Sequence, residues 1–190
     1  MIDEFEYLFA TPIGVYKLDE DLKSLNKFAY SQTSDRSISN RGGIQTEDLN
    51  VKDKTIKTLC KQILEASKSY AKQFGFTDNL FIQNIWVNIN KKHNFNVEHT
   101  HPFSLISGTF YVKTNKDTGN IVFTNPNVAM EGYVKKEYVK EYNPLNSNIW
   151  WYTPQDNVLI LFPSWLKHQV ETNQSEEDRI SISFNINAIS

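Results

Sequence analysis

The sequence predicts a mainly β domain with helices near its N-terminus, in the class of the jelly rolls and cupins, whose two sheets enclose a central pocket. The prediction rests on two observations. Apolar residues recur at helical spacing as far as residue 74 and alternate from residue 80 onwards. Short alternating segments separated by turn residues then follow, and helices segregated from such a β-region are typical of α+β or all-β domains.

One domain is expected over 1–190, with an N-terminal part at 1–78 and a jelly-roll core at 79–190. Helical spacing of apolar residues predicts helices over 20–31 and 53–74. These helices would brace the outer face of one sheet. The other N-terminal elements are a first strand over 7–18, bent at Pro12 and Gly14, and a polar loop over 32–50.

The core is expected to consist of about seven short strands. In the first of them, Phe81, Ile85, Val87 and Ile89 lie at alternate positions and so are expected to share one face. Residues 125–147 are polar and are expected to form a loop with some added strand. The predicted strands cover 80–90, 104–113, 119–124, 148–153, 157–162, 166–172 and 179–187.

Composition excludes several classes of protein. The net charge of −2 leaves no basic surplus to neutralise a phosphate backbone, so no nucleic-acid partner is expected. The single cysteine, Cys60, rules out an internal disulfide and a cysteine-based zinc site, and we expect it to be a buried thiol. The N-terminus is acidic without the basic region of a signal peptide, and no apolar stretch approaches the roughly 20 residues that span a bilayer. We therefore expect a cytoplasmic protein without a membrane partner.

Histidines are the candidate metal ligands, and the chain has only four of them. His99 and His101 are two residues apart, and at the start of a strand their side chains would point to the same face. With His168 from a second strand they could hold one metal ion on one side, which leaves positions open for substrate and oxygen. The alternative is that they are surface or hydrogen-bonded core histidines. His93 lies in a polar loop and is expected to be solvated.

Arg179 is the candidate anion-binding residue. It follows His168 by eleven positions and begins an Arg-x-Ser pattern on a hydrophobic strand. Two strands joined by a short turn would bring its guanidinium to the base of the histidine pocket, where it can take a distal carboxylate bidentately with help from Ser181. The alternative is an exposed arginine paired with one of the three acidic residues just before it.

The stretch from Trp86 to Asn187 resembles the 2-oxoglutarate/Fe(II) oxygenase superfamily, and it is most like the 2OG-Fe(II) oxygenases of bacteria and phages. The resemblance covers a little over half of the chain and depends on a combination of motifs. The motifs are W-x-N at 86–88, H-T-H-P at 99–102, S-G-T-F-Y-V at 107–112, F-P-S-W-L-x-H at 162–168 and R-I-S-I-S-F-N at 179–185.

The resemblance implies a double-stranded β-helix, the jelly roll of these oxygenases, with Fe(II), 2-oxoglutarate and O2 as cofactor and co-substrates. It implies that His99 and His168 bind the iron and that Arg179, with Ser181, holds the C5 carboxylate of 2-oxoglutarate. The superfamily usually has Asp or Glu where this chain has His101. Either the iron has three histidine ligands, or His101 does not contact the iron and a carboxylate is the third ligand.

Two further residues are candidates for contact with 2-oxoglutarate. Asn88 precedes the metal motif and Tyr111 follows it, although a buried structural amide and a core tyrosine are the alternative interpretations. The implied activity is hydroxylation of a C–H bond in an unidentified small-molecule or peptide substrate, with release of succinate and CO2. The alternative functions are a cupin-like metalloenzyme that does not use 2-oxoglutarate and a non-catalytic jelly-roll binding module. Edge strands would permit a homodimer, and a phage-encoded protein would act in the host cytoplasm.

Overall fold

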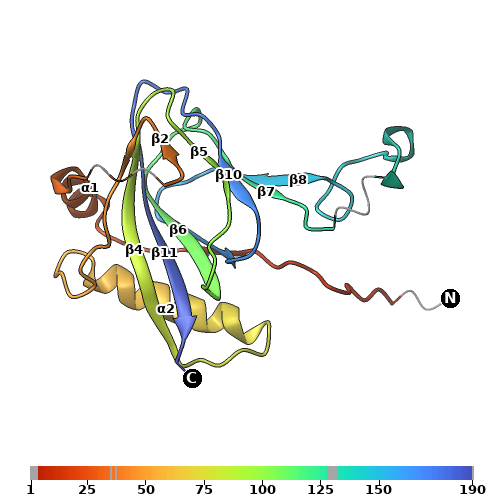
Figure 1. Ribbon diagram of the computed structural model, residues 1–190, viewed down its shortest axis with the longest axis horizontal. Helices are drawn as coiled ribbons and strands as arrows, with labels where there is room; N and C mark the ends of the chain where they lie inside the picture. Colours follow the sequence, from red (N-terminus) through yellow and green to blue (C-terminus); the bar gives the residue numbers. More distant parts are fainter. Residues whose placement is uncertain (1–3, 35, 37, 128–131, 190) are drawn as a thin grey trace.

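The computed structural model describes residues 4–34, 36, 38–127 and 132–189. Within these residues the chain forms two α-helices, one short 3-10 helix and two antiparallel sheets (Figure 1). The helices are α1 (Leu22–Ser31), α2 (Lys57–Lys72) and the 3-10 helix η2 (Lys136–Tyr138). The strands are β1 (Gly14–Lys17), β2 (Asn40–Arg41), β3 (Ile44–Gln45), β4 (Leu80–Asn90), β5 (Phe95–His99), β6 (Ile106–Lys113), β7 (Ile121–Thr124), β8 (Ile149–Tyr152), β9 (Val158–Pro163), β10 (His168–Val170) and β11 (Arg179–Ala188).

The two sheets form the predicted jelly roll. The larger sheet has the strand order β1-β9-β6-β11-β4-β3, and the smaller sheet has the order β2-β5-β10-β7-β8. Consecutive strands repeatedly switch between the sheets: β4 and β6 lie in the larger one, whereas β5 and β7 lie in the smaller one. This alternation brings residues distant in sequence to face each other across the space between the sheets.

The larger sheet has one apolar and one polar face. At its centre β11 pairs with β4 and β6, so that Ile182 lies opposite Val87 and Phe110. All three side chains are fully buried in the main core, on the outer face. Side chains of the next residue along each strand point the other way, towards the smaller sheet, and they are largely polar. The period-two alternation of these strands therefore places apolar side chains in the core on one face and polar side chains between the two sheets on the other.

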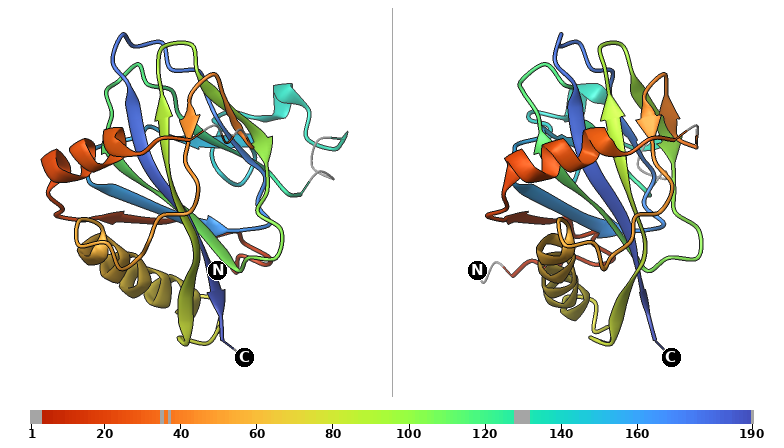
Figure 2. Two further views of the ribbon diagram at one scale, coloured as in Figure 1. Left: turned by 60° about the vertical axis from the view of Figure 1, so that its left-hand side comes forward. Right: turned by 90° about the vertical axis from the view of Figure 1, so that its left-hand side faces the viewer.

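The two helices cover the outer face of the larger sheet, as the sequence predicts (Figure 2). Leu59 and Ile63 on α2 are fully buried in the same core as the strands, and each contributes about 1.5–3 kcal/mol by burial. Helix α1 begins after Asp21, whose carboxylate accepts hydrogen bonds from the backbone N–H groups of Lys23 and Ser24. Cys60 on α2 is buried as expected. No helix in the described ranges is long and apolar enough to cross a membrane.

The N-terminal boundaries differ from those predicted. Strand β1 covers only Gly14–Lys17 instead of 7–18, because Pro12 has no N–H to donate and Phe9 adopts a positive φ of 58°. The expected loop at 32–50, of which residues 35 and 37 lie outside the described part, contains the short strands β2 and β3. A Cβ atom at the intervening Gly43 would lie only 2.4 Å from the carbonyl oxygen of Ile89 on β4, so the close approach of this turn to β4 requires glycine.

The polar excursion between β7 and β8 carries the 3-10 helix η2. Added strand was predicted within 125–147, but its described residues contain none, and residues 128–131 lie outside the described part. The excursion projects from the body of the domain (Figure 1). Its side chains around Tyr133 and Tyr138 are largely exposed, so little burial is available to hold an extra strand there.

Candidate functional site

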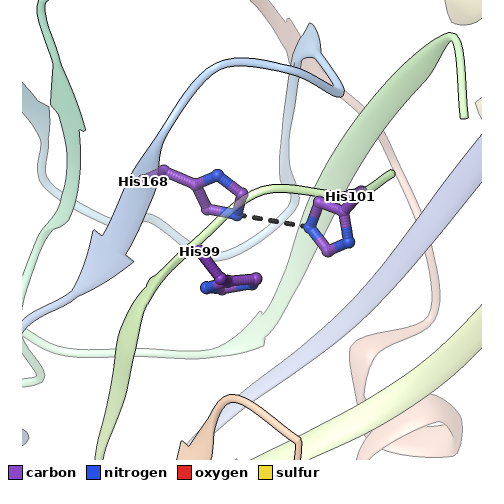
Figure 3. Close-up of side chains that lie close together, drawn as sticks. All are labelled: His99, His101 and His168. Atoms are coloured by element: carbon purple, nitrogen blue, oxygen red, sulfur yellow. Dashed lines mark hydrogen bonds between the residues drawn. The ribbon is translucent and has the colours of Figure 1, made fainter. Parts of the chain in front are cut away.

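Three of the four histidines meet on the inner side of the smaller sheet (Figure 3). His99 on β5 and His168 on β10 are register partners in neighbouring antiparallel strands. His99, His101 and His168 each offer one ring nitrogen as a ligand, and these three nitrogens lie within 4.8 Å of one another. Among the described residues this is the only such group of metal-ligating side chains. His93, by contrast, is exposed in the turn before β5, as predicted.

Backbone carbonyl groups orient two of the rings. The Nδ1 atom of His99 lies 2.7 Å from the carbonyl oxygen of Val97, and Nδ1 of His168 lies 2.9 Å from that of Leu166. A carbonyl oxygen can only accept, so each Nδ1 carries the proton and each Nε2 keeps its lone pair. A histidine whose second nitrogen donates to a carbonyl is the usual arrangement for a metal ligand.

The H-x-H pair lies at the end of a strand and not at the start that was predicted. His99 is the last residue of β5, and His101 lies in the following turn. Pro102 has no N–H for a strand ladder, which favours the end of the strand at this point. His101 is held instead by its backbone N–H, which donates to the carbonyl oxygen of Ser164 at 2.9 Å. Both side chains still reach the same cavity.

All three imidazoles are in the neutral, metal-binding form at pH 7. Burial lowers the pKa of His99, and burial together with the His99 charge lowers the pKa of His101 to about 3. The pKa of His168 lies well below its ordinary value, mainly because of burial and also because of the two other histidines. Neutral imidazoles bind a metal ion without first releasing a proton.

A cavity with about 470 Å³ of empty space, part of it open to solvent, extends from the histidines between the two sheets. Arg179, the first residue of β11, lines it and is only 2% exposed. Its Nη1 donates to the carbonyl oxygens of Thr118, Gly119 and Glu171. Its Nη2 and the hydroxyl of Tyr111 are buried and have no hydrogen-bond partner among the described residues. Arg179 and Tyr111 therefore each bring an unused donor group to the cavity.

Arg179 is not the exposed, salt-bridged residue of the alternative interpretation. The acidic residues before it are engaged elsewhere: Glu176 pairs with Lys92, Glu177 with Lys113, and Asp178 accepts from Tyr30. The strands of His168 and Arg179 follow each other in the chain, as expected, but β10 and β11 belong to different sheets. Arg179 reaches the cavity from the sheet that faces the histidines.

Ser181 and Asn88 also line the cavity, as expected, and they are register partners on β11 and β4. The Asn88 amide is partly committed to the protein. Its Nδ2 donates to Ser183 at 3.2 Å, and its Oδ1 accepts from Asn40 at 3.5 Å. Asn88 therefore combines a place on the cavity wall with a structural role between β2, β4 and β11.

Trp86 belongs to the site, although sequence reasoning gave it no role. Its indole lies 5.8 Å from the ring of His101, and its Nε1 is buried without a partner among the described residues. Trp86 lies two residues before Asn88 on β4 and thus on the same inner face. That spacing was the available signal, because it already placed both side chains on one side of the strand.

Comparison with known proteins identifies the family of this chain. A family model described as "Putative 2OG-Fe(II) oxygenase" matches residues 84–185, which is more than half of the chain. The chain belongs to this family. As a 2OG-Fe(II) oxygenase it is a dioxygenase that uses Fe(II), 2-oxoglutarate and O2, and the resemblance noted in the sequence is confirmed. No curated protein matches the sequence.

Solved structures of other oxygenases share the fold of this 2OG-Fe(II) oxygenase at low sequence identity. The α-ketoglutarate-dependent epimerase SnoN of nogalamycin biosynthesis is 11% identical with a TM-score of 0.68, covering 93% of this chain and 76% of SnoN. HygX from Streptomyces hygroscopicus, solved with nickel, 2-oxoglutarate and hygromycin B, is 10% identical with a TM-score of 0.67, covering 94% and 83%. A Pseudomonas putida prolyl-4-hydroxylase is 11% identical with a TM-score of 0.65, covering 96% of both chains.

The side chains of the cavity fit the cofactor and co-substrate of the family. Three neutral imidazoles suit a divalent iron ion. The buried guanidinium of Arg179 and the hydroxyl of Tyr111, each with an unused donor, suit a carboxylate that has left water. A binding module that lacks a cofactor would have no need for such unsatisfied donors beside a histidine cluster, since each costs about 1–3 kcal/mol.

Proposed function

We propose that His99, His101 and His168 bind the catalytic Fe(II), and that Arg179 holds the distal carboxylate of 2-oxoglutarate in the cavity beside them. The proposal rests on groups from distant parts of the chain that meet in one cavity. Three metal-ligating nitrogens within 4.8 Å of one another share one cavity with a buried guanidinium that has an unused N–H group. The metal group comes from the smaller sheet and Arg179 from the larger one.

His101 is the third ligand in this proposal. Its Nε2 lies 3.3 Å from that of His168, and no carboxylate from the described residues belongs to the cluster. Glu98 is unavailable because its carboxylate accepts from Thr124 at 2.7 Å and lies 3.4 Å from Lys167 Nζ. A site of three imidazoles carries one negative charge fewer than the usual site with a carboxylate, so we expect its affinity for Fe(II) to differ.

Arg179 is held in position for a carboxylate. Carbonyl oxygens accept from Nη1, which leaves Nη2 as the buried nitrogen of this cavity-lining arginine that has no partner among the described residues. Burial lowers the pKa of Arg179 to about 10, so the guanidinium remains charged at pH 7. Tyr111 and Ser181 lie on adjacent strands in register with each other, and their hydroxyls support the same carboxylate in the proposal. Asn88 lies on the other side of Ser181 and completes that wall.

When bound, Fe(II) and 2-oxoglutarate supply the oxidation of a substrate C–H bond by O2, which gives the alcohol, succinate and CO2, with one oxygen atom in each organic product. The protein contributes the fixed imidazoles, the guanidinium and a buried cavity. The substrate is proposed to be a small molecule or a peptide. The similar structures include enzymes of both kinds, since one holds hygromycin B and another is a prolyl hydroxylase.

A pair of variants tests the assignment of the two halves of the site. Arg179→Met removes the guanidinium but keeps an unbranched side chain, and His168→Ala removes one proposed ligand. Binding of Mn(II) and of 2-oxoglutarate is measured by anaerobic calorimetry, and succinate formation is measured with Fe(II) in air.

We expect Arg179→Met to bind Mn(II) like the wild type but to lose 2-oxoglutarate binding by more than about 100-fold, since a charged, buried contact is lost. His168→Ala should lose both ligands. Tight 2-oxoglutarate binding by Arg179→Met, or stoichiometric metal binding by folded His168→Ala, would refute the respective assignment. Circular dichroism of each variant establishes that it is folded.

A further inference from the structure

A second hollow also reaches His99 and His101. We call it the outer groove, and it contains about 740 Å³ of space, part of it open to solvent. It shares Ser39, Trp86, His99 and His101 with the inner cavity, whereas Arg179 and Tyr111 line only the inner one. If 2-oxoglutarate occupies the inner cavity, as proposed above, the outer groove is where a second molecule reaches the metal.

The wall of the outer groove is rich in amide side chains. Gln45 on β3, Gln83 and Asn84 on β4, and Asn185 on β11 all line it. Gln83 is oriented by the protein, because its Oε1 accepts from Ser104 at 3.0 Å and from Asn187 at 3.3 Å. Its amide nitrogen has no partner among the described residues and remains available as a donor. Side-chain amides both donate and accept, so such a wall matches a ligand with many hydroxyl groups.

The charges at the rim of the outer groove cancel. Among the described residues, Arg36 and Asp48 are its only fully charged lining residues, and Arg36 Nη1 lies 3.6 Å from Asp48 Oδ1. Asp48 also accepts from Asn84 at 2.7 Å. A phosphorylated or polyanionic substrate would need an excess of cationic groups, which the lining does not provide.

Few apolar side chains line the outer groove. They are Ile38, Pro102 and Trp86, and Trp86 lies at the inner end beside His101. A peptide or lipid chain usually binds through deep apolar pockets that take anchor side chains, and this lining has none of that kind. An indole beside amide and hydroxyl groups instead suits a ligand whose C–H groups pack against the ring and whose polar groups form hydrogen bonds with the amides.

We propose that the outer groove binds the primary substrate and that this substrate is a small, uncharged, polyhydroxylated molecule of the carbohydrate or cyclitol type. The inference rests on the proposed function, because it takes the metal and 2-oxoglutarate to occupy the inner cavity. The amides of Gln83 and Asn84 bind its hydroxyls, and Trp86 packs against its C–H groups near the metal.

The test uses the full chain loaded with Zn(II) and 2-oxoglutarate, which binds ligands without turnover. A panel of neutral mono- and disaccharides and inositols is examined by saturation-transfer NMR and calorimetry. Glucose 6-phosphate, laurate and an acetylated tetrapeptide amide are the comparison ligands. Gln83→Leu and Asn84→Leu test the groove, and Gln169→Leu is the matched control, since Gln169 is also exposed on a strand but lies on β10 outside the groove.

We expect at least one neutral polyol to bind, with affinity reduced by roughly tenfold in the Gln83→Leu and Asn84→Leu double variant, because two hydrogen bonds are lost. The control should bind like the wild type, and all proteins should bind 2-oxoglutarate equally. Binding of only the phosphate, the lipid or the peptide, no polyol binding at all, or equal polyol binding by the double variant would overturn the inference. Failure of 2-oxoglutarate itself to bind would instead count against the proposed function.

Discussion

His101 and His168 place their Nε2 atoms 3.3 Å apart, although 67 positions separate them in the chain. Two imidazole nitrogens that are each about 2.1 Å from one ion, at right angles to each other, lie roughly 3 Å apart. The folded chain therefore holds this pair of nitrogens near the separation that a shared ion requires. The Ser164 carbonyl that accepts from the His101 N–H contributes to this preorganisation.

The role of His101 can be tested by exchange for the residue that the superfamily usually has. His101→Ala should weaken Fe(II) or Mn(II) binding by more than about 100-fold, since the loss of a direct ligand exceeds the 10–100-fold effect of removing an outer hydrogen bond. His101→Asp should recover most of the affinity because a carboxylate is itself a ligand. Anaerobic calorimetry with Mn(II) provides the measurement.

His93→Ala is the control for these variants, because His93 is exposed and outside the cluster. It should bind the metal like the wild type. If His101→Ala also binds one equivalent of metal with nearly unchanged affinity, His101 is not a ligand and must act through its neighbours.

The stability of the metal-free protein should depend on the histidine cluster. Burial lowers the pKa of His101 to about 3 in the folded chain, whereas the unfolded value is near 6.5. The unfolded state therefore binds more protons between these values, so the free energy of unfolding should fall as pH falls from about 6.5 towards 3. Each buried histidine contributes a slope of up to about 1.4 kcal/mol per pH unit.

Urea unfolding in EDTA at pH 7.5, 6 and 5 measures this dependence. The His101→Asn variant should show a shallower slope than the wild type, because it lacks one of the groups that take up a proton on unfolding. Equal slopes for the two proteins would mean that His101 is protonated in the folded state or already neutral in the unfolded one.

The spacing of apolar residues predicted the helices and strands that form the core, because an element that buries one face needs apolar residues at regular intervals. Both β4 and β11 begin where they were expected to begin, and Ile85, Val87 and Ile89 on β4 are buried as predicted. Phe81, predicted on the same face, is 39% exposed, because the register of β4 with β11 shifts between Asn84 and Ile82 and interrupts the alternation. Strands β2 and β3 were missed, since two residues are too few to show alternation. Their pairing depends on contacts with β4 and β5, which are distant in the sequence.

The candidate site was predictable by residue type but not by placement. Histidines at 99, 101 and 168 and the arginine at 179 stand out because few residues bind metals or buried carboxylates. The short connection after His168 predicted that Arg179 lies near it, but it did not show that the two residues lie on separate sheets. This placement depends on the chain crossing from one sheet to the other between β10 and β11, and no local sequence pattern predicts such a crossing.

Tyr111→Phe should have opposite effects on folding and on ligand binding. The Tyr111 hydroxyl is buried and has no partner among the described residues, so removing it should stabilise the 2-oxoglutarate-free protein by about 1 kcal/mol. If the hydroxyl binds the carboxylate, 2-oxoglutarate affinity should fall by roughly threefold to tenfold. Urea unfolding and calorimetry measure the two effects. A loss of stability together with unchanged affinity would indicate that the hydroxyl has a structural partner instead.

Gly108 on β6 should not tolerate a side chain. A Cβ atom there would lie 2.5 Å from Cζ of Phe184 and 2.7 Å from the carbonyl oxygen of Ile160. Because the carbonyl belongs to the backbone of β9, relief would require the central strands to separate. We expect Gly108→Ala to lower the free energy of unfolding by about 2–3 kcal/mol, the usual cost of overpacking a core.

Gly132→Ala provides the matched control, since a Cβ atom there meets no atom of the described residues beyond its chain neighbours within 4 Å. It should change the free energy of unfolding by less than about 0.5 kcal/mol in the same urea titration. Gly108 also lines the inner cavity, so the unfolding data should be read together with Mn(II) affinity. Because the histidines lie on the other sheet, a moderately destabilised but folded Gly108→Ala should still bind the metal. If the folded Gly108→Ala variant loses metal binding, the larger sheet positions the histidines directly.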